Sequence, residues 1–382
     1  MKDNTVSPYT VCQLLSLIRS SLWQTPIELC HFSYNSANWD EIGRIAMQQT
    51  VGILMAEAAL SLPENLLPPK DWIRKAYAIM ERNRRTHRLL DGCVAESVTR
   101  LKDAGIDTVL LKGQAYARKY PYSALRQCGD IDLYVGVENY RRAYNAVKQF
   151  GWEKDESLIP DAKHYGCRLR GVRIELHRIA GQLFPRSVDR NFQEWSRTEL
   201  LTSGEGVVID GVPITVPSPI FSIVFVFMHL YHHFLNGGIG LRHVCDWTML
   251  LHAYSKCFDR VELENRLREF HLLRAWKYFA PIAVRHLGLP APECPFYSPD
   301  YDVKSEKILS FILREGNFGR AVRTESKRPD GYFAGKLHSF VNHSVRIYSK
   351  LWIDPIANTY NYYSYVKIGI KQVVRDIIKK IR

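Results

Sequence analysis

The sequence predicts a mixed α+β fold in which a small α/β unit, residues 105–217, lies between two helical regions, 1–104 and 218–382. In both outer regions, apolar residues recur every three or four positions, which is the spacing of amphipathic helices. In the middle, short apolar runs bounded by turn residues replace that spacing and indicate strands and hairpins. A chain of 382 residues is also long for a single hydrophobic core.

The N-terminal region is expected to contain two long helices. Apolar residues at helical spacing predict one helix over Ile42–Leu60 and another over Trp72–Leu101. Pro68 and Pro69 lie between them, and consecutive prolines end a helix.

Strands and turns alternate through the central unit. We expect strands at Thr108–Leu111 and Ile131–Val135, a helix over 137–150, a hairpin of Tyr165–Leu169 with Val172–His177, and a second hairpin within Val207–Val216. The two hairpins turn at Arg170-Gly171 and Asp210-Gly211, since glycine favours such turns. Helical spacing returns after Pro217 and Pro219 and continues to the C-terminus, with a loop near 289–299.

Three carboxylates occupy strand positions from which they can share one face of the sheet. Asp130 and Asp132 are two residues apart in one predicted strand, and Glu175 alternates with apolar neighbours in a later one. Adjacent ionised carboxylates repel each other by about 1–4 kcal/mol at about 4 Å near a protein surface. A hard divalent cation removes this repulsion, and oxygen ligands suit Mg²⁺ or Mn²⁺. Three such carboxylates can hold two metal ions for an in-line displacement at phosphorus.

The surrounding motif resembles a known family. The run Leu110-Leu111-Lys112-Gly113, then Arg126, then Asp130-Ile131-Asp132-Leu133 is similar to the DNA polymerase β-type nucleotidyltransferase superfamily, and within it to uncharacterised bacterial nucleotidyltransferases. The resemblance covers about residues 40–255. It includes Tyr120-Pro121, Glu175-Leu176-His177 and a later segment with His229, Gly240-Leu241-Arg242 and Asp246.

The resemblance implies a polymerase β-like core and metal-dependent transfer of a nucleoside monophosphate from a nucleoside triphosphate, expected to be ATP, to a hydroxyl acceptor. Asp130 and Asp132 match the metal ligands of the family. Glu175 matches the third carboxylate, which helps to deprotonate the attacking hydroxyl. The acceptor is left open among a small molecule, a sugar, a protein side chain and an RNA end.

Basic residues near the carboxylates are candidates for binding the triphosphate. The superfamily usually has Gly-Ser or Gly-Gly where this chain has Lys112-Gly113, so Lys112 or Arg126 replaces the missing serine contact. Gly113 allows backbone N–H groups to approach phosphates closely. For Arg126 the alternative is a structural ion pair with the carboxylates; for Lys112 it is a solvated lysine at the end of a strand.

Several further side chains are candidates for the cleft or the acceptor site. His177 either orients Glu175 or the acceptor, or is a hydrogen-bonded structural histidine. His229 and His233 are four residues apart on a predicted helix, where they either line the cleft or pack between helices. Zinc is disfavoured there because no glutamate follows His229. Arg242 is a fourth candidate, with pairing to Asp246 across one helical turn as the alternative.

The positive charge is concentrated outside the proposed catalytic unit. The net charge is +13, and residues 301–382 contain 16 Lys or Arg against 7 Asp or Glu. From Val366 onward, an apolar stripe runs beside a row of basic residues, Lys367, Lys371, Arg375 and Lys379. Such a helix can contact an anionic membrane or a nucleic acid, or simply pack on its own domain.

The location expected for the protein is cytoplasmic. The apolar stretch near the N-terminus is too short for a secretory signal, and no run reaches the roughly 20 residues of a transmembrane helix. The eight cysteines form no CxxC pair and are expected to be reduced thiols.

Two other functions remain open from the sequence. One is a catalytically inactive module that keeps the fold and binds nucleic acid or a partner. The other is a toxin-like tRNA nucleotidyltransferase, whose RNA binding would weaken steeply with salt.

Overall fold

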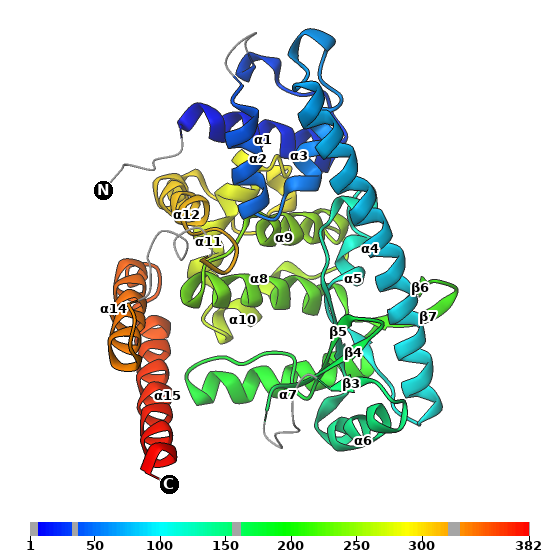
Figure 1. The fold of residues 1–382 in the computed structure, drawn as a ribbon, viewed down its shortest axis with the longest axis vertical. Helices are drawn as coiled ribbons and strands as arrows, with labels where there is room; N and C mark the ends of the chain where they lie inside the picture. The colour runs from blue at the N-terminus through cyan, green and yellow to red at the C-terminus, as the bar shows by residue number, and fades with distance from the viewer. Residues whose placement is uncertain (1–6, 33–36, 155–161, 320–328, 382) are drawn as a thin grey trace.

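The computed structural model describes residues 7–32, 37–154, 162–319 and 329–381 (Figure 1). The helices are α1 (Pro8–Trp23), α2 (Trp39–Gln48), α3 (Gly52–Ala59), α4 (Lys70–Asp103), α5 (Gln114–Ala117), α6 (Gly136–Gln149), α7 (Arg186–Thr202), α8 (Pro219–Asn236), α9 (Leu241–Ala253), α10 (Arg260–Glu269), α11 (Leu273–Pro281), α12 (Asp302–Glu315), α14 (Tyr332–Lys350) and α15 (Pro355–Ile381). The strands are β1 (Val109–Leu110), β2 (Asp130–Tyr134), β3 (Glu153–Lys154), β4 (His164–Leu169), β5 (Val172–His177), β6 (Glu205–Ile209) and β7 (Val212–Val216). The mixed α+β fold is therefore confirmed.

The N-terminal helices cover one end of the molecule, and α4 runs from them along one side to the sheet (Figure 1). The prediction of α4 from the Pro68-Pro69 break is confirmed, with Pro69 as its N-cap. The single helix expected over Ile42–Leu60 is wrong, because the chain breaks between α2 and α3 at Thr50, whose φ is 54°. The break lets the buried Gln49 side chain bond to the carbonyl of Ile312 (3.0 Å) and the amide of Leu241 (3.1 Å). These tertiary bonds tie the N-terminal helices to α9 and α12.

A five-stranded mixed sheet forms the centre of the α/β unit, in the order β1-β2-β5-β4-β3. Strands β2 and β5 are parallel, and the other neighbouring pairs are antiparallel. Both predicted hairpins are present. Arg170 and Gly171 adopt φ of 53° and 79°, and Asp210 and Gly211 adopt 47° and 77°, the positive values of tight two-residue hairpin turns. The second hairpin, β6–β7, is a separate two-stranded sheet that packs on α4 and β1.

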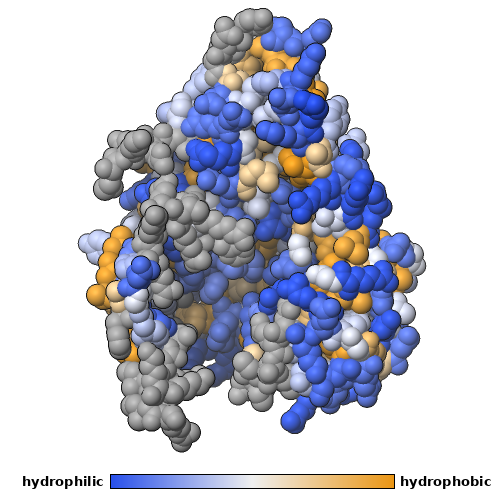
Figure 2. Space-filling model, in the orientation of Figure 1, coloured by the Kyte–Doolittle hydropathy of each residue, from blue (hydrophilic) through white to orange (hydrophobic). Residues whose placement is uncertain are grey.

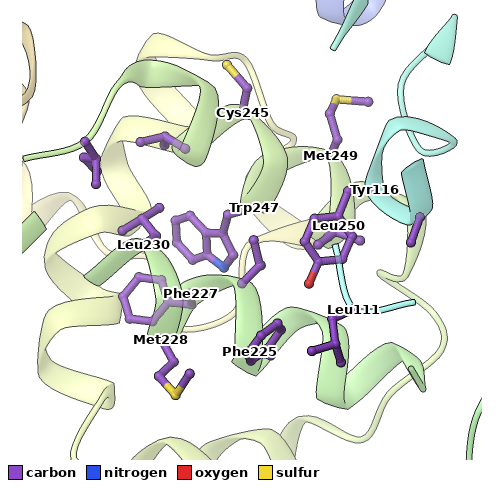
Figure 3. Packing of buried hydrophobic residues seen from close by; sticks show 14 of the residues in the cluster. Leu111, Tyr116, Phe225, Phe227, Met228, Leu230, Cys245, Trp247, Met249 and Leu250 are labelled. Carbon is purple, nitrogen blue, oxygen red and sulfur yellow. The ribbon is translucent and has the colours of Figure 1, made fainter. Parts of the chain in front are cut away.

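Helices α8 and α9 join the sheet to the C-terminal region. Because α8 is apolar on nearly all sides, it is buried along most of its length. Figure 3 shows Phe227 of α8 against Trp247 of α9, with Tyr116 of α5 and Leu111 on the other side. The ring centroids of Phe227 and Trp247 are 5.0 Å apart. The hydrophobic core therefore continues from the central unit into the helices that follow it.

Helices α14 and α15 lie along one edge of the molecule (Figure 1). Hydrophobic residues of α14 are visible on this edge in Figure 2. Four of them are exposed at helical spacing: Leu337, Val341, Val345 and Tyr348. The side chains from Arg375 onward, which include two members of the predicted basic row, lie outside the described residues. Among the helices that the structure describes, none combines the length and the apolarity needed to cross a membrane. All eight cysteines are free thiols.

Candidate functional site

The three predicted carboxylates lie on one face of the parallel strand pair. Asp132 is directly opposite Glu175 in the register of β2 and β5. Asp130 is two residues before Asp132 in β2 and therefore lies on the same face. The intervening Ile131 and Leu133 point to the opposite face and are buried. The alternation of polar and apolar residues in each strand thus brings these carboxylates together.

The Lys-Gly turn after β1 lies against this face. Lys112 Nζ is 3.0 Å from Oδ1 of Asp132 and 3.2 Å from Nε2 of His229. Gly113 has φ of 63°, and a Cβ added there would lie 3.1 Å from the Asp130 carbonyl oxygen. Glycine is therefore needed here both for its backbone conformation and for the close approach to β2.

Asp132 and Asp130 have opposite electrostatic environments. Burial alone would raise the pKa of Asp132, but the Lys112 ammonium and a 2.8 Å hydrogen bond from His177 Nε2 hold it far below its ordinary value. Asp130 is solvent-exposed and has no ion-pair partner among the described residues; partial desolvation by the surrounding protein and the charge of Asp132 raise its pKa. As pH rises, Asp132 therefore loses its proton before Asp130 does.

Glu175 is held by side chains on both of its oxygens. Arg173 Nε donates to Oε1 at 3.1 Å, while Oε2 lies 3.4 Å from His177 Nε2 and 3.6 Å from His164 Nδ1. Burial opposes ionisation, but the His177 hydrogen bond and the nearby imidazoles lower the pKa of Glu175 overall. Glu175 is therefore an ionised carboxylate, oriented with one oxygen toward two histidines.

Helix α8 closes the site from the side of the C-terminal region. His229 Nε2 lies 3.2 Å from His233 Nε2 as well as contacting Lys112. Burial, with the positive charges around it, lowers the pKa of His233 to about 3 and that of His229 well below its ordinary value. Both imidazoles are therefore neutral at pH 7. The predicted His229 and His233 are thus brought next to the carboxylate face.

Arg126 and Arg242 do not contact the carboxylates. Arg126 is buried and forms hydrogen bonds of 2.7 and 2.8 Å with the two oxygens of Asp246 on α9. Arg242 donates to the carbonyl of Gln127 at 3.2 Å. The alternative pairing of Arg242 with Asp246 is wrong, because Asp246 points inward to Arg126.

Two residues near the site were missed by the sequence analysis. Lys163 precedes β4, and its pKa is lowered to about 8 by burial and by the charge of Lys112. His164 begins β4 and lies directly opposite His177. The signal was available: a two-residue turn at Arg170-Gly171 sets the hairpin register, and counting outward from it pairs position 164 with 177.

Two overlapping sets of ligands can hold a cation here. Asp130, Asp132 and Glu175 provide the carboxylate oxygens that Mg²⁺ prefers. His164, Glu175 and His177 provide two nitrogens and one oxygen, and these ligand atoms all lie within 4.8 Å of one another.

Comparisons with known proteins found one matching family and one similar solved structure. The family described as "Uncharacterised nucleotidyltransferase" matches residues 35–288. A solved structure of an antigenic nucleotidyltransferase-like protein from Paracoccidioides brasiliensis is similar over 52% of this chain and 92% of that chain, with 17% identity and a TM-score of 0.32. No curated protein matches the chain. Because the family match spans more than half of the sequence, the chain belongs to this family of uncharacterised nucleotidyltransferases.

Proposed function

We propose that the protein is a metal-dependent nucleotidyltransferase of the polymerase β type, which transfers a nucleoside monophosphate from a triphosphate, expected to be ATP, to a hydroxyl acceptor. The observation that carries this proposal is the grouping of Asp130, Asp132 and Glu175 on one face of two parallel strands, beside Lys112. Family membership supports the reaction class.

In this proposal Asp130, Asp132 and Glu175 hold Mg²⁺ or Mn²⁺. The fit of the residues is good, because all three donors are carboxylates and Asp130 lacks an ion-pair partner among the described residues. A bound divalent cation supplies charge neutralisation at the phosphates and acidifies the attacking hydroxyl.

The side chains of the protein have separate roles in the transfer. The acceptor oxygen forms a bond to the α-phosphorus, the bond from that phosphorus to the bridging oxygen breaks, and pyrophosphate leaves. Glu175 accepts the proton of the hydroxyl. Lys112 and Lys163 bind the phosphates electrostatically, and the backbone at Gly113 lies beside them.

Arg126 has an indirect, structural role in this proposal and does not bind the triphosphate. Its contact with the triphosphate would require the Asp246 pair to open, so Lys163 takes that role and Arg126 positions the segment before β2. His177 orients Glu175 and Asp132. His229, His233 and Arg242 line the acceptor side of the cleft.

In the same proposal, the C-terminal helices provide a basic surface that contacts an anionic partner. Ile370 and Val374 are exposed on the same helix, α15, as the exposed Lys367 and Lys371, and α14 also exposes apolar residues. This combination favours an anionic membrane surface over RNA. The acceptor would then be reached at or near that surface.

The experiment is to incubate the full chain with each α-labelled triphosphate, Mg²⁺ or Mn²⁺ and a cell extract, and to follow the label. We expect labelling by the wild type and at least about 100-fold less by Glu175→Gln, the usual effect of losing a general base. Glu293→Gln is the matched control, because Glu293 pairs with His252 outside the site. Equal labelling by Glu175→Gln would disprove the role of Glu175.

A second measurement separates an enzyme from an inactive binding module. Asp130→Asn and Asp132→Asn should lose metal-dependent nucleotide binding while keeping the far-UV circular dichroism of the wild type. Undiminished nucleotide binding by both variants would favour the binding module instead.

A further inference from the structure

We propose that His164, Glu175 and His177 form a binding site for a divalent first-row transition-metal ion, so that the centre prefers such a cation to Mg²⁺ at the position of Glu175. The catalytic meaning of this site rests on the proposed function, whereas cation binding is measurable without turnover. The site is a second ligand set that shares only Glu175 with the carboxylates proposed above.

The fold places these three side chains together on one face of the sheet. His164 and His177 are direct partners across the antiparallel β4–β5 pair, so their side chains point to the same side. Glu175 lies two residues before His177 in β5 and therefore shares that side. Its partner on β4 is Gly166, which places no side chain over Glu175. The space above Glu175 is thus approached by the two histidines.

The distances fit coordination of one ion. The Oε2 atom of Glu175 is 3.4 Å from His177 Nε2 and 3.6 Å from His164 Nδ1. Bonds of about 2.1 Å to a tetrahedral ion separate neighbouring ligand atoms by about 3.4 Å. Two of the three separations therefore match a coordination shell, and all three ligand atoms lie within 4.8 Å of one another.

The neighbouring groups orient the ligands. Arg173 binds Oε1 of Glu175, which directs Oε2 toward the histidines. Asp132 Oδ1 lies 2.8 Å from His177 Nε2 and 3.0 Å from Lys112 Nζ, and this pairing keeps it outside the ligand set. His177 is almost fully buried and Glu175 is 16% exposed, whereas His164 is 28% exposed and lies toward solvent. A cation can thus enter from the His164 side.

The chemistry of the donors selects the kind of metal. Mg²⁺ keeps oxygen ligands and several waters, whereas imidazole suits zinc, iron, cobalt and nickel. The competing explanation is that His177 is a proton donor between Asp132 and Glu175 and that no metal binds. That explanation assigns no role in binding to His164, so His164 is the residue to test.

The test uses the full chain and Co²⁺ as the probe, with visible absorption and calorimetry. We expect one equivalent of Co²⁺ to bind, and His164→Gln to weaken binding by at least about tenfold, since even outer partners of a metal site cost that much. Two variants control for other histidines: His252→Gln removes a separate His–Glu pair, and His233→Gln removes the pair formed with His229. Unchanged Co²⁺ affinity in His164→Gln, or loss of binding in His233→Gln, would overturn the proposal.

A measurement on the wild type covers the case in which His164→Gln does not fold. One equivalent of Co²⁺ should give strongly hyperfine-shifted imidazole N–H signals from directly bound His164 and His177, and none from His252. Hyperfine-shifted signals from His229 and His233 alone would contradict the assignment.

Failure of this inference is distinguishable from failure of the proposed function. Suppose that labelling requires Glu175 and proceeds with Mg²⁺, while Co²⁺ affinity is unchanged in His164→Gln. This result overturns the proposed metal site but supports the nucleotidyltransferase activity. Co²⁺ binding that depends on His164, with no labelling under any metal, does the reverse.

Discussion

The guanidinium of Arg126 and the carboxylate of Asp246 form a doubly hydrogen-bonded ion pair that is 5% exposed on both sides. Tyr120 donates a third hydrogen bond, of 2.7 Å, to the same carboxylate. The pair ties the segment before β2 to α9, which follows α8 in the C-terminal region. The position of the Asp130 strand relative to His229 thus depends on a contact between residues 120 positions apart in the chain.

Replacing Asp246 by Asn should lower the free energy of unfolding by about 3–5 kcal/mol, because the guanidinium of Arg126 then remains buried without a counter-charge. Urea unfolding measures this effect. Arg74→Ala, which breaks an exposed pair with Asp71, is the control and should cost less than about 1 kcal/mol. Similar losses in both variants would show that the buried pair is not important for stability.

Gly113→Ala should destabilise the protein by about 1–3 kcal/mol, because alanine is strained at positive φ and its Cβ would press on the Asp130 carbonyl. Thermal unfolding followed by circular dichroism is a suitable measurement. The matched control is Gly129→Ala, where φ is not positive and no atom lies within 4 Å of the added Cβ. If the two variants have the same melting temperature, the turn after β1 is not under this constraint.

Stability should rise with pH above about pH 8 because of Lys350. This lysine is buried against Glu315 at 2.9 Å, and burial lowers its pKa to about 8, below the value of about 10.4 in an unfolded chain. Between these values the unfolded state binds more protons, so the contribution of Lys350 to stability is lost as pH falls through 8.

The measurement is the difference in unfolding free energy between the wild type and Lys350→Met at pH 7.5, 8.5 and 9.5. We expect this difference to shift in favour of the wild type as pH rises. A difference that is constant across the series would mean that Lys350 titrates normally in the folded protein.

The C-terminal helices should bind vesicles that contain anionic lipid and not vesicles of neutral lipid alone. Reversing Lys367 and Lys371 to Glu should weaken this binding by at least about 30-fold, since each basic residue near an anionic surface contributes about 1 kcal/mol. Co-sedimentation provides the measurement, with Lys102→Glu/Lys154→Glu as a control of equal charge change elsewhere. If the wild type instead binds RNA with an affinity that falls steeply as salt increases, and does not bind vesicles, the result would favour a nucleic-acid contact and the tRNA-directed alternative.

Much of the central unit could be predicted from local pattern. The alternation around Asp130, Asp132 and Glu175 and the turn at Arg170-Gly171 each depend on residues close in sequence, and the structure contains the corresponding strands and hairpin. The break between α2 and α3 could not be predicted in this way. Gln49 leaves the helix because its side chain bonds to α9 and α12, and such bonds have no signature in local hydrophobic spacing.

The sequence by itself predicted every described strand except the edge strand β3, together with the two hairpin turns and the face on which each carboxylate lies, because a strand has a period of two and a tight turn sets the register. Only the tertiary structure decided which charges meet across that face. Lys112 contacts Asp132 and His229, and Arg126 forms an ion pair with Asp246. His164 lies close to Glu175 and His177. Partners for a buried charge are selected by the desolvation cost of leaving it unpaired, and that cost depends on which elements pack together, not on distance along the chain.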